Sequence, residues 1–291
     1  MEFLQQLLNG LALGSVYALL ALGYTMVYGI INLINFAHGE IYMIGAFIGY
    51  FASTTFNLSL IPTLIIAMIG SAILGMIIEK VAYKPLRNSP RITLLITAIG
   101  MSLLLQNGMR FIVGPNPKPY KDLIPNSFIN LGNVQINSKT LLMLGVSALL
   151  VLLLQFIVYK TKIGLAMRAA SYDIEAASLM GINVNNTIST TFAIGSALAG
   201  IAGVLVAIAY PSINPYMGTM PGLRAFVAAV LGGIGSIPGA LVGGVLIGLI
   251  ETLAKAYIST SFSDAIVFSV LIIILLLKPS GLLGKKANEK V

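Results

Sequence analysis

Residues 141–159, LLMLGVSALLVLLLQFIVY, contain no charged side chain over nineteen consecutive positions. An α-helix of about 20 apolar residues spans the roughly 30 Å hydrocarbon core of a lipid bilayer. Apolar and polar residues do not alternate along this run, as they would in a half-buried strand, and an open sheet edge cannot be satisfied in lipid. The stretch therefore predicts a membrane-spanning helix.

The rest of the chain has the same character. Of its 291 residues, 57% are hydrophobic and only 9% are charged, whereas soluble globular proteins carry about 25% charged residues. The mean hydropathy is +0.95. These values exclude a soluble enzyme, a disordered chain and a nucleic-acid binder. The net charge of +8 does not indicate nucleic-acid binding either, because the cations lie in short loops between apolar runs. The predicted fold class is an all-α integral membrane protein.

Other runs have the length and composition of membrane spans. A cleaved signal peptide is not expected, because residues 1–10 contain Glu2 and no Lys or Arg. About eight transmembrane helices are predicted, at 7–30, 36–53, 58–79, 92–112, 141–159, 187–210, 236–255 and 262–278. A shorter glycine-rich run, 222–234, is left over and is expected to form a broken helix.

The orientation follows from the basic residues in the loops, which gather on the cytoplasmic side of membrane proteins. Loops 79–91 and 160–186 and the tail 278–291 hold 11 of the 17 cations: Lys80, Lys84, Arg87, Arg91, Lys160, Lys162, Arg168, Lys278, Lys285, Lys286 and Lys290. Placing these segments in the cytoplasm puts loop 113–140 outside. The run 222–234 must then cross as well, which places the N-terminus outside and the C-terminus in the cytoplasm.

This layout predicts an internal repeat within a single transmembrane domain, 1–291. Four crossings form a first repeat (about 7–112), a linking span (141–159) leads to a cytoplasmic loop (160–186), and four more crossings form a second repeat (about 187–278). The two groups have opposite orientation, which is how inverted-repeat transporters are built. In sequence, Gly14-Ser15 followed by Ala18 corresponds to Gly195-Ser196 followed by Ala199.

The stretch 231–244, LGGIGSIPGALVGG, has six glycines and one proline in fourteen residues. Such a sequence does not hold an unbroken helix, and broken backbone at membrane depth persists only where protein or a water-filled path surrounds it. We favour a role in the transport pathway or its gate, with these candidates: Gly232, Gly233, Gly235, Pro238 and Gly239. The alternative is a tight cytoplasmic turn between two spans.

Ionisable residues inside a membrane are costly and often functional. His38 and Glu40 lie in 32–40, NLINFAHGE, at the entry to the second span. With Asn35 they form a second group of gate candidates. The alternative is a cytoplasmic turn in which Asn35 caps the helix and both side chains are in water. Glu251 and Lys255 are four residues apart and are expected to pair on one helix face.

Chemistry-bearing motifs are otherwise sparse. The chain has no Cys and one His, which excludes disulfides and thiolate sites and argues against a His-rich metal centre. It has no Gly-x-x-x-x-Gly-Lys P-loop and no Gly-x-Ser-x-Gly nucleophile elbow. We therefore expect no catalytic residue, no metal site and no cofactor bound by this chain.

Segment 160–186 is too polar to span a membrane and is rich in helix-forming alanine. A second short helix is predicted within it, capped by Ser171 or Asp173 and ended by Gly181. A short helix on the inner membrane face suits the docking of a partner protein. The alternative is a solvated connector.

The same segment carries a resemblance. Glu175-Ala-Ala-x-x-x-Gly181 is similar to the opening of the EAA motif, with which ABC importer permeases dock to their ATPase, although Thr191 stands where the motif has an apolar residue. The whole chain resembles the branched-chain amino acid ABC transporter permeases of the leucine/isoleucine/valine type. The stretches that carry this likeness are Asn9–Gly23 (NGLALGSVYALLALG), Asn35–Gly39 (NFAHG), Ile163–Ala169 (IGLAMRA), Gly222–Phe226 (GLRAF) and Leu231–Gly239 (LGGIGSIPG).

The resemblance implies a permease subunit with an inverted-repeat ABC importer core in a bacterial plasma (inner) membrane. It implies two ATP-binding cassette ATPases that hold the ATP and Mg, a related second permease subunit, and an extracytoplasmic substrate-binding protein. The ATPase-coupling residues would be Gly164, Arg168, Asp173, Glu175, Ala176, Ala177 and Gly181. The alternatives are the same machine for urea, short amides or another small solute, and, in a different class, an ion-coupled transporter or channel.

Overall fold

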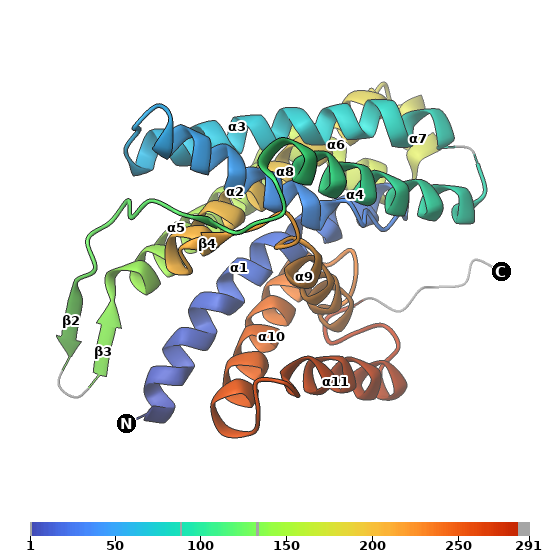
Figure 1. Ribbon diagram of the computed structural model, residues 1–291. Coiled ribbons are helices and arrows are strands. Elements are labelled where there is room, and N and C mark those ends of the chain that lie inside the picture. Colours follow the sequence, from blue (N-terminus) through green and yellow to red (C-terminus); the bar gives the residue numbers. More distant parts are fainter. Residues whose placement is uncertain (1, 88, 132–133, 285–291) are drawn as a thin grey trace.

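The computed structural model describes residues 2–87, 89–131 and 134–284, so the predicted cytoplasmic cations Lys285, Lys286 and Lys290 lie outside the described residues. The fold is a bundle of helices, shown in Figure 1. The α-helices are α1 (Glu2–Ile31), α2 (His38–Thr54), α3 (Leu60–Ile78), α4 (Arg91–Val113), α5 (Ser138–Lys160), α6 (Lys162–Tyr172), α7 (Ile174–Leu179), α8 (Val184–Ala209), α9 (Thr219–Gly232), α10 (Ile237–Tyr257) and α11 (Ser263–Leu277). A π-helical turn (Glu79–Tyr83) and a 3-10 turn (Lys84–Leu86) continue α3.

A helix forms at each of the eight predicted runs and at the leftover glycine-rich run. Among the described residues, six helices are long and apolar enough to cross a membrane: α1, α3 with its continuation, α4, α5, α8 and α10. The other three are shorter, with 17 residues in α2, 14 in α9 and 15 in α11. The helix α9 is itself unbroken, and the predicted break follows it, at residues 233–236.

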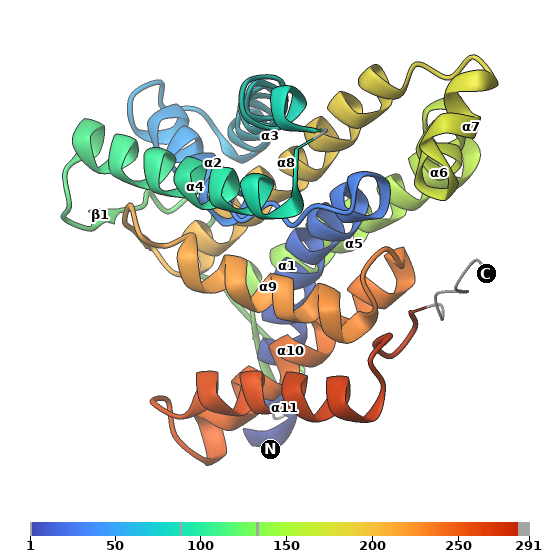
Figure 2. The ribbon, with the colours of Figure 1, turned by 90° about the vertical axis from the view of Figure 1, so that its right-hand side faces the viewer.

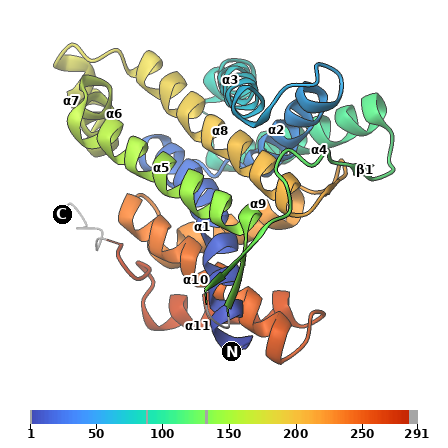
Figure 3. The same cartoon turned by 90° about the vertical axis from the view of Figure 1, so that its left-hand side faces the viewer.

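Two of the long helices form the centre of the bundle. Most residues of α1 and α8 are buried, whereas α3, α4 and α5 expose most of their apolar side chains. Exposed Ile, Leu and Phe side chains on those outer helices are what a lipid-facing surface requires. Figures 2 and 3 show α1 in the middle of the bundle, with α5 and α8 on one side of it and α9 and α10 on the other.

The packing partners are the same in the two halves of the chain. The helix α1 packs on α10 just as α8 packs on α3, and α2 contacts α3 and α8 just as α9 contacts α10 and α1. Exchanging α1 with α8, α2 with α9 and α3 with α10 leaves this set of contacts unchanged. The internal repeat predicted from the sequence would produce such a correspondence.

Glycines allow these helix pairs to approach closely. A Cβ atom at Gly244 of α10 would collide with the backbone of Ala18 on α1. In the corresponding pair, a Cβ atom at Gly200 of α8 would collide with the Ser71 side chain on α3. Small residues are therefore required where the two helices of each pair meet.

In the described part of the chain, the predicted outer loop 113–140 contains three of the four short strands. In it, β1 (Lys118–Pro119) pairs antiparallel with β4 (Ser212–Ile213), which follows α8. A hairpin of β2 (Phe128–Leu131) and β3 (Val134–Asn137) precedes α5. The pairing of β1 with β4 ties the loop after α4 to the loop after α8, so these two loops close the same end of the bundle.

Candidate functional site

The turn before α2 lies inside the protein. The side chains of Asn35, His38 and Glu40 are all about 98% buried. Asn35 does not cap α2, because the preceding residue is Ala37, and the Asn35 Oδ1 atom accepts a hydrogen bond from the Tyr83 hydroxyl at 2.7 Å. The alternative of a water-exposed turn capped by Asn35 is therefore wrong.

His38 and Glu40 are closely packed against neighbouring helices. Even so, a polar atom of each of these side chains has no hydrogen-bond partner among the described residues. The His38 ring lies edge-on to the Tyr24 ring, with centroids 4.8 Å apart, and fills the space that a Cβ atom at Gly23 would occupy. The Glu40 Oε1 atom accepts a hydrogen bond from Ser102 of α4 at 3.3 Å. Among the described residues, no hydrogen-bond partner is present for Glu40 Oε2, His38 Nε2 or Asn35 Nδ2.

The first turn of α2 meets the first turn of α9. A Cβ atom at Gly39 would lie 2.5 Å from the carbonyl oxygen of Gly218 and 3.1 Å from the Cα atom of Gly222. The buried Gly39 thus packs against Gly218 and Gly222 at the start of α9, whereas the neighbouring Thr219 and Met220 are exposed.

The glycine-rich group of gate candidates forms a tight turn between α9 and α10. Gly233 and Gly235 have φ values of +105° and +90°, a region that favours glycine. Ser236 then caps α10, where its Oγ atom accepts a hydrogen bond from the Gly239 backbone amide at 3.2 Å, and Pro238 occupies the first turn. Gly232 and Gly239 pack backbone against backbone.

The segment after α11 covers this turn. The amides of Leu282 and Leu283 donate to the carbonyl oxygens of Leu231 and Gly232 at 2.8 and 2.9 Å, and so satisfy two carbonyls that end α9. The geometry is that of the tight turn left as an alternative, and a gate role for these glycines stays a prediction. The two groups of gate candidates lie at opposite ends of the 14-residue α9, about 20 Å apart by the rise of a helix, so the structure does not bring them together.

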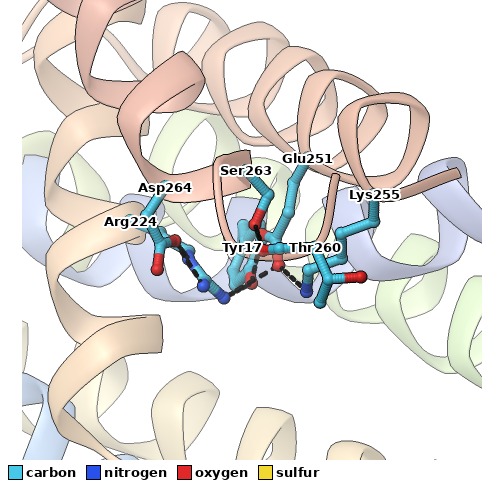
Figure 4. A network of polar contacts seen from close by, with 7 residues as sticks. All are labelled: Tyr17, Arg224, Glu251, Lys255, Thr260, Ser263 and Asp264. Carbon is cyan, nitrogen blue, oxygen red and sulfur yellow. Dashed lines mark hydrogen bonds and ion pairs between the residues drawn. The ribbon is translucent and has the colours of Figure 1, made fainter. Parts of the chain in front are cut away.

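A network of charged residues joins four helices (Figure 4). At its centre is the fully buried Glu251 of α10, whose carboxylate contacts Arg224 of α9 at 2.8 Å, Lys255 at 2.5 Å and the Tyr17 hydroxyl of α1 at 2.7 Å. Arg224 also pairs with Asp264 of α11 at 2.5 Å. The predicted pairing of Glu251 with Lys255 is confirmed.

The part played by Arg224 was not predicted. The sequence did contain an indication of its role, because Arg224 is the one charged residue of the otherwise apolar α9. Its partners lie 40 and 27 residues away in α11 and α10, and no local pattern points to them. Arg224 thus secures the short α9 to the helices around it.

A second buried carboxylate joins α3 to α8. Glu79, at the end of α3, pairs with Arg87 at 2.5 Å and accepts a hydrogen bond from Ser189 of α8 at 2.6 Å. Arg87 in turn donates to Asn185 at 2.8 Å. The two helix pairs that correspond in the two halves, α1–α10 and α3–α8, each carry one buried glutamate.

The predicted coupling loop folds as two short helices. Asp173 caps α7, accepting hydrogen bonds from the backbone amides of Glu175 and Ala176 at 2.9 and 3.0 Å. Gly181, with φ of +83°, follows the helix end. Both the second short helix and its cap agree with the sequence prediction.

One side of this helix pair is anchored and the other is exposed. Gly164 and Ala177 are buried, and the Arg168 guanidinium lies 5.7 Å from the centre of the Tyr159 ring. By contrast, Tyr172 and Leu179 are each 88% exposed. Figures 2 and 3 place α6 and α7 at the end of the bundle opposite to β1. The pair thus presents exposed apolar side chains where a partner protein can reach them.

A polar cavity of about 770 Å³ lies near the start of α1. Its walls come from α1, the β2–β3 hairpin, α5, the end of α8 and α10. The lining residues are Glu2, Gln5, Gln6, Asn9, Ala12, Leu13, Phe128, Gln135, Asn137, Lys139, Thr140, Met143, Ala209, Tyr210, Thr252, Lys255 and Ala256. In the part of the chain that the structure describes, no group of three or more His, Cys, Asp or Glu side chains is placed to hold a metal ion.

Comparison with known proteins identifies the relatives of this chain. The family model described as "Branched-chain amino acid transport system / permease component" matches residues 6–275. The high-affinity branched-chain amino acid transport system permease protein BraD of Pseudomonas aeruginosa is 44% identical, covering 100% of this chain and 98% of BraD. The corresponding permease protein LivH of Salmonella typhimurium is 45% identical, covering 99% and 98%.

A more distant relative is the permease protein LivM of the same system in Salmonella typhimurium, which is 26% identical over 92% of this chain and 68% of LivM. Among solved structures, PsaBC from Streptococcus pneumoniae in complex with Fab matches with a TM-score of 0.52 and 16% identity, covering 96% of this chain and 93% of that one. This last similarity concerns the fold alone.

Proposed function

Because the chain belongs to the family of permease components of branched-chain amino acid transport systems, we propose that it is the membrane permease subunit of an ATP-driven ABC importer for leucine, isoleucine and valine. The observation that carries the proposal is the full-length similarity, at 44–45% identity, to BraD and LivH. The helical bundle with six long apolar helices is that of a multi-pass membrane protein.

The protein lies in the inner membrane with its N-terminus outside and its C-terminus in the cytoplasm. The support is the excess of Lys and Arg in segments 79–91 and 160–186. In the structure, the coupling helices α6 and α7 occupy one end of the bundle and β1 the other, as this orientation requires.

The chain works with partners, and hydrolysis of ATP takes place on separate subunits. Two ATP-binding cassette ATPases, which hold the ATP and Mg, dock on α6 and α7. The coupling residues are Gly164, Arg168, Asp173, Glu175, Ala176, Ala177 and Gly181. A second permease subunit completes the membrane core, which is supported by the distant similarity to LivM. A substrate-binding protein delivers the amino acid at the outer face.

The geometry of the coupling helices suits the transmission of movement. The helix α6 follows α5 after the single residue Thr161, whose side chain accepts a hydrogen bond from the Gly164 amide at 3.2 Å. Gly164 packs so closely on the carbonyl of Val158 that a Cβ atom would collide with it. The helix α7 leads through a short turn into the central α8. A displacement of α6 and α7 by the ATPases is therefore passed to both α5 and α8.

The two halves of the membrane domain, α1–α4 and α8–α11, act as inverted repeats that open alternately to each side. The meeting point of α2 and α9 serves as a central gate, with Asn35, His38 and Glu40 around it. The unpaired polar atoms of these three side chains support this role, since buried polar groups normally have partners. The α9–α10 turn, with Gly232, Gly233, Gly235, Pro238 and Gly239, serves as the second gate element.

The test is stimulation of ATP hydrolysis in the purified complex by candidate substrate-binding proteins. We expect the leucine-loaded branched-chain amino acid binding protein to raise the rate. Stimulation only by a binding protein loaded with urea or a short amide would contradict the assigned substrate class. As a test of the coupling role, Arg168→Ala and Glu175→Ala together should weaken ATPase association and transport, and unchanged association and uptake would contradict that role.

A further inference from the structure

The cavity near the start of α1 is lined by a mixture of apolar, polar and charged side chains, which helix packing alone does not require. Its apolar lining includes the buried Ala12 and Met143 and the partly buried Leu13. Its walls carry amide and hydroxyl groups, and three charged residues line it: Glu2, Lys139 and Lys255. The volume of about 770 Å³ falls within the range of small-molecule sites, roughly 300–1,000 Å³.

This composition matches one class of ligand. A branched-chain amino acid has an apolar side chain, a positive ammonium group and a negative carboxylate. A cavity lined by apolar side chains and by groups of both signs accommodates all three parts.

The two lysines of the cavity differ in their availability. Lys139 is 8% exposed and is held by Asp122 at 2.7 Å. Lys255 is 38% exposed and pairs with Glu251, which also contacts Arg224 and Tyr17. If Lys255 turns toward an incoming carboxylate, Glu251 therefore keeps a charged partner, and the exchange leaves no buried charge unpaired. Of the two lysines, Lys255 is therefore the one that can bind a ligand at a low energetic cost.

We propose that this cavity is a vestibule on the outer face that receives the zwitterionic substrate, with Lys255 binding its carboxylate in exchange for Glu251. The inference rests on the proposed function for the orientation of the chain and for the substrate class. It adds a consequence: the exchange changes the environment of Arg224, and so connects an arriving substrate to α9 and the central gate.

The natural absence of cysteine makes a direct test possible. A single Thr252→Cys substitution places a thiol in the cavity wall, and Ser261→Cys places one on an exposed loop at the same end of α10, outside the cavity. Ser171→Cys, on α6, is the control for the opposite side. The assembled transporter in oriented vesicles is treated from outside with a membrane-impermeant thiol reagent, with and without leucine-loaded binding protein.

We expect Thr252→Cys and Ser261→Cys to react and Ser171→Cys not to react. Leucine-loaded binding protein should slow the reaction at Thr252→Cys only, and leucine-free binding protein should not. Adding Lys255→Gln should weaken protection by free leucine by about tenfold, the loss typical of one hydrogen bond to a charged group, whereas Lys255→Arg should preserve it. Isopentylamine, which is leucine without its carboxylate, should protect equally in the Lys255 and Lys255→Gln backgrounds.

The proposal is overturned if Thr252→Cys is unreactive in the assembled transporter, which would mean that a partner subunit covers the cavity. It is overturned equally if leucine never protects, or if protection is the same in Lys255→Gln. ATP-driven uptake of leucine by the same vesicles reports the proposed function separately. Uptake without protection rejects the vestibule alone, and absence of uptake in vesicles with intact Ser261→Cys labelling rejects the transport assignment.

Discussion

At the scale of single residues, glycine packing and buried charge pairs account for most of what holds this bundle together. Gly14 and Gly244 let α1 and α10 touch backbone to backbone, and Gly75 and Gly200 make room for the side chains of Ser196 and Ser71 where α3 meets α8. Without a hydrophobic effect between helices in lipid, such close contact is a main source of association. Other glycines, such as Gly100, have open space where a side chain would be placed.

We therefore predict that Gly244→Ala destabilises the protein by about 1–3 kcal/mol, the usual cost of overpacking, because its Cβ atom collides with the Ala18 backbone. Gly100→Ala is the matched control and should be neutral or slightly stabilising, since Ala is the better helix former. The measurement is the midpoint of thermal unfolding of the purified protein in mild detergent. Equal midpoints for the two variants would reject the packing account.

The charge network leads to a second prediction. Removing one partner of a buried ion pair costs up to about 3–5 kcal/mol, mostly through the charge left behind. Arg224→Met and Glu251→Gln should each lower the unfolding midpoint, and the double variant should lose less than the sum, with a coupling energy of about 0.5–3 kcal/mol. Strict additivity in this double-mutant cycle would show that the 2.8 Å contact is not maintained in the membrane.

Sequence reasoning reached some of these residues and missed others for a physical reason. The Glu251–Lys255 pair was predictable because partners four residues apart on a helix share a face. Arg224 could be noticed as an unusual charge, but its partner Tyr17 is 207 residues away and the pairing depends on how α1, α9 and α10 pack. For His38 and Glu40, the sequence left a buried and a water-exposed environment open, and the packing of distant segments around them, seen in their burial, decides between the two.

At the scale of elements, hydrophobic length predicted where helices occur but not where they begin. The first helix starts at Glu2 instead of residue 7, and the sixth predicted span starts at Val184 instead of residue 187. Polar residues at these ends are hidden by neighbouring segments or extend beyond the apolar core, and hydropathy alone does not register either effect. The lengths of α2 and α9 are close to those of the predicted runs 36–53 and 222–234, but the contact between the first turns of the two helices was not predicted.

The cap of α7 carries a prediction for coupling. Asp173→Ala removes an acceptor for two backbone amides, and the loss of such a cap costs about 1 kcal/mol. We expect it to loosen α7 and to lower ATP-driven uptake several-fold. Asp173→Asn, which caps equally well, should retain most of the activity. If both variants transport at the original rate, the order of α7 is not needed for coupling.

The turn between α9 and α10 leads to a prediction about transport. Gly235 has open space around it but a φ of +90°, so Gly235→Leu is strained by its backbone and not by a collision. We expect Gly235→Leu and Gly239→Leu to stop uptake while the complex still assembles. Gly235→Asn should be better tolerated, because Asn adopts positive φ more readily than other residues with a side chain. Normal uptake by both leucine variants would reject a gate role for the turn.

At the scale of the whole molecule, the two halves of the chain share one pattern of helix contacts, each with a buried glutamate in its principal pair. Between them, two short helices meet end to end at Gly39 and Gly218. On one end of the bundle, α6 and α7 expose Tyr172 and Leu179. Under the proposed function, the meeting point of α2 and α9 is the central gate, and α6 and α7 form the docking surface for an ATPase subunit that supplies the energy.

The central claim is that this chain is one membrane subunit of an ATP-driven importer. The most direct measurement is to solubilise the tagged protein from native membranes in mild detergent and determine which proteins co-purify, and in what ratio. The account predicts two P-loop ATPases and one further hydrophobic permease for each copy of this chain, with leucine uptake restored on reconstitution with ATP. Recovery of this chain alone, with uptake intact, would contradict it and indicate a self-sufficient transporter.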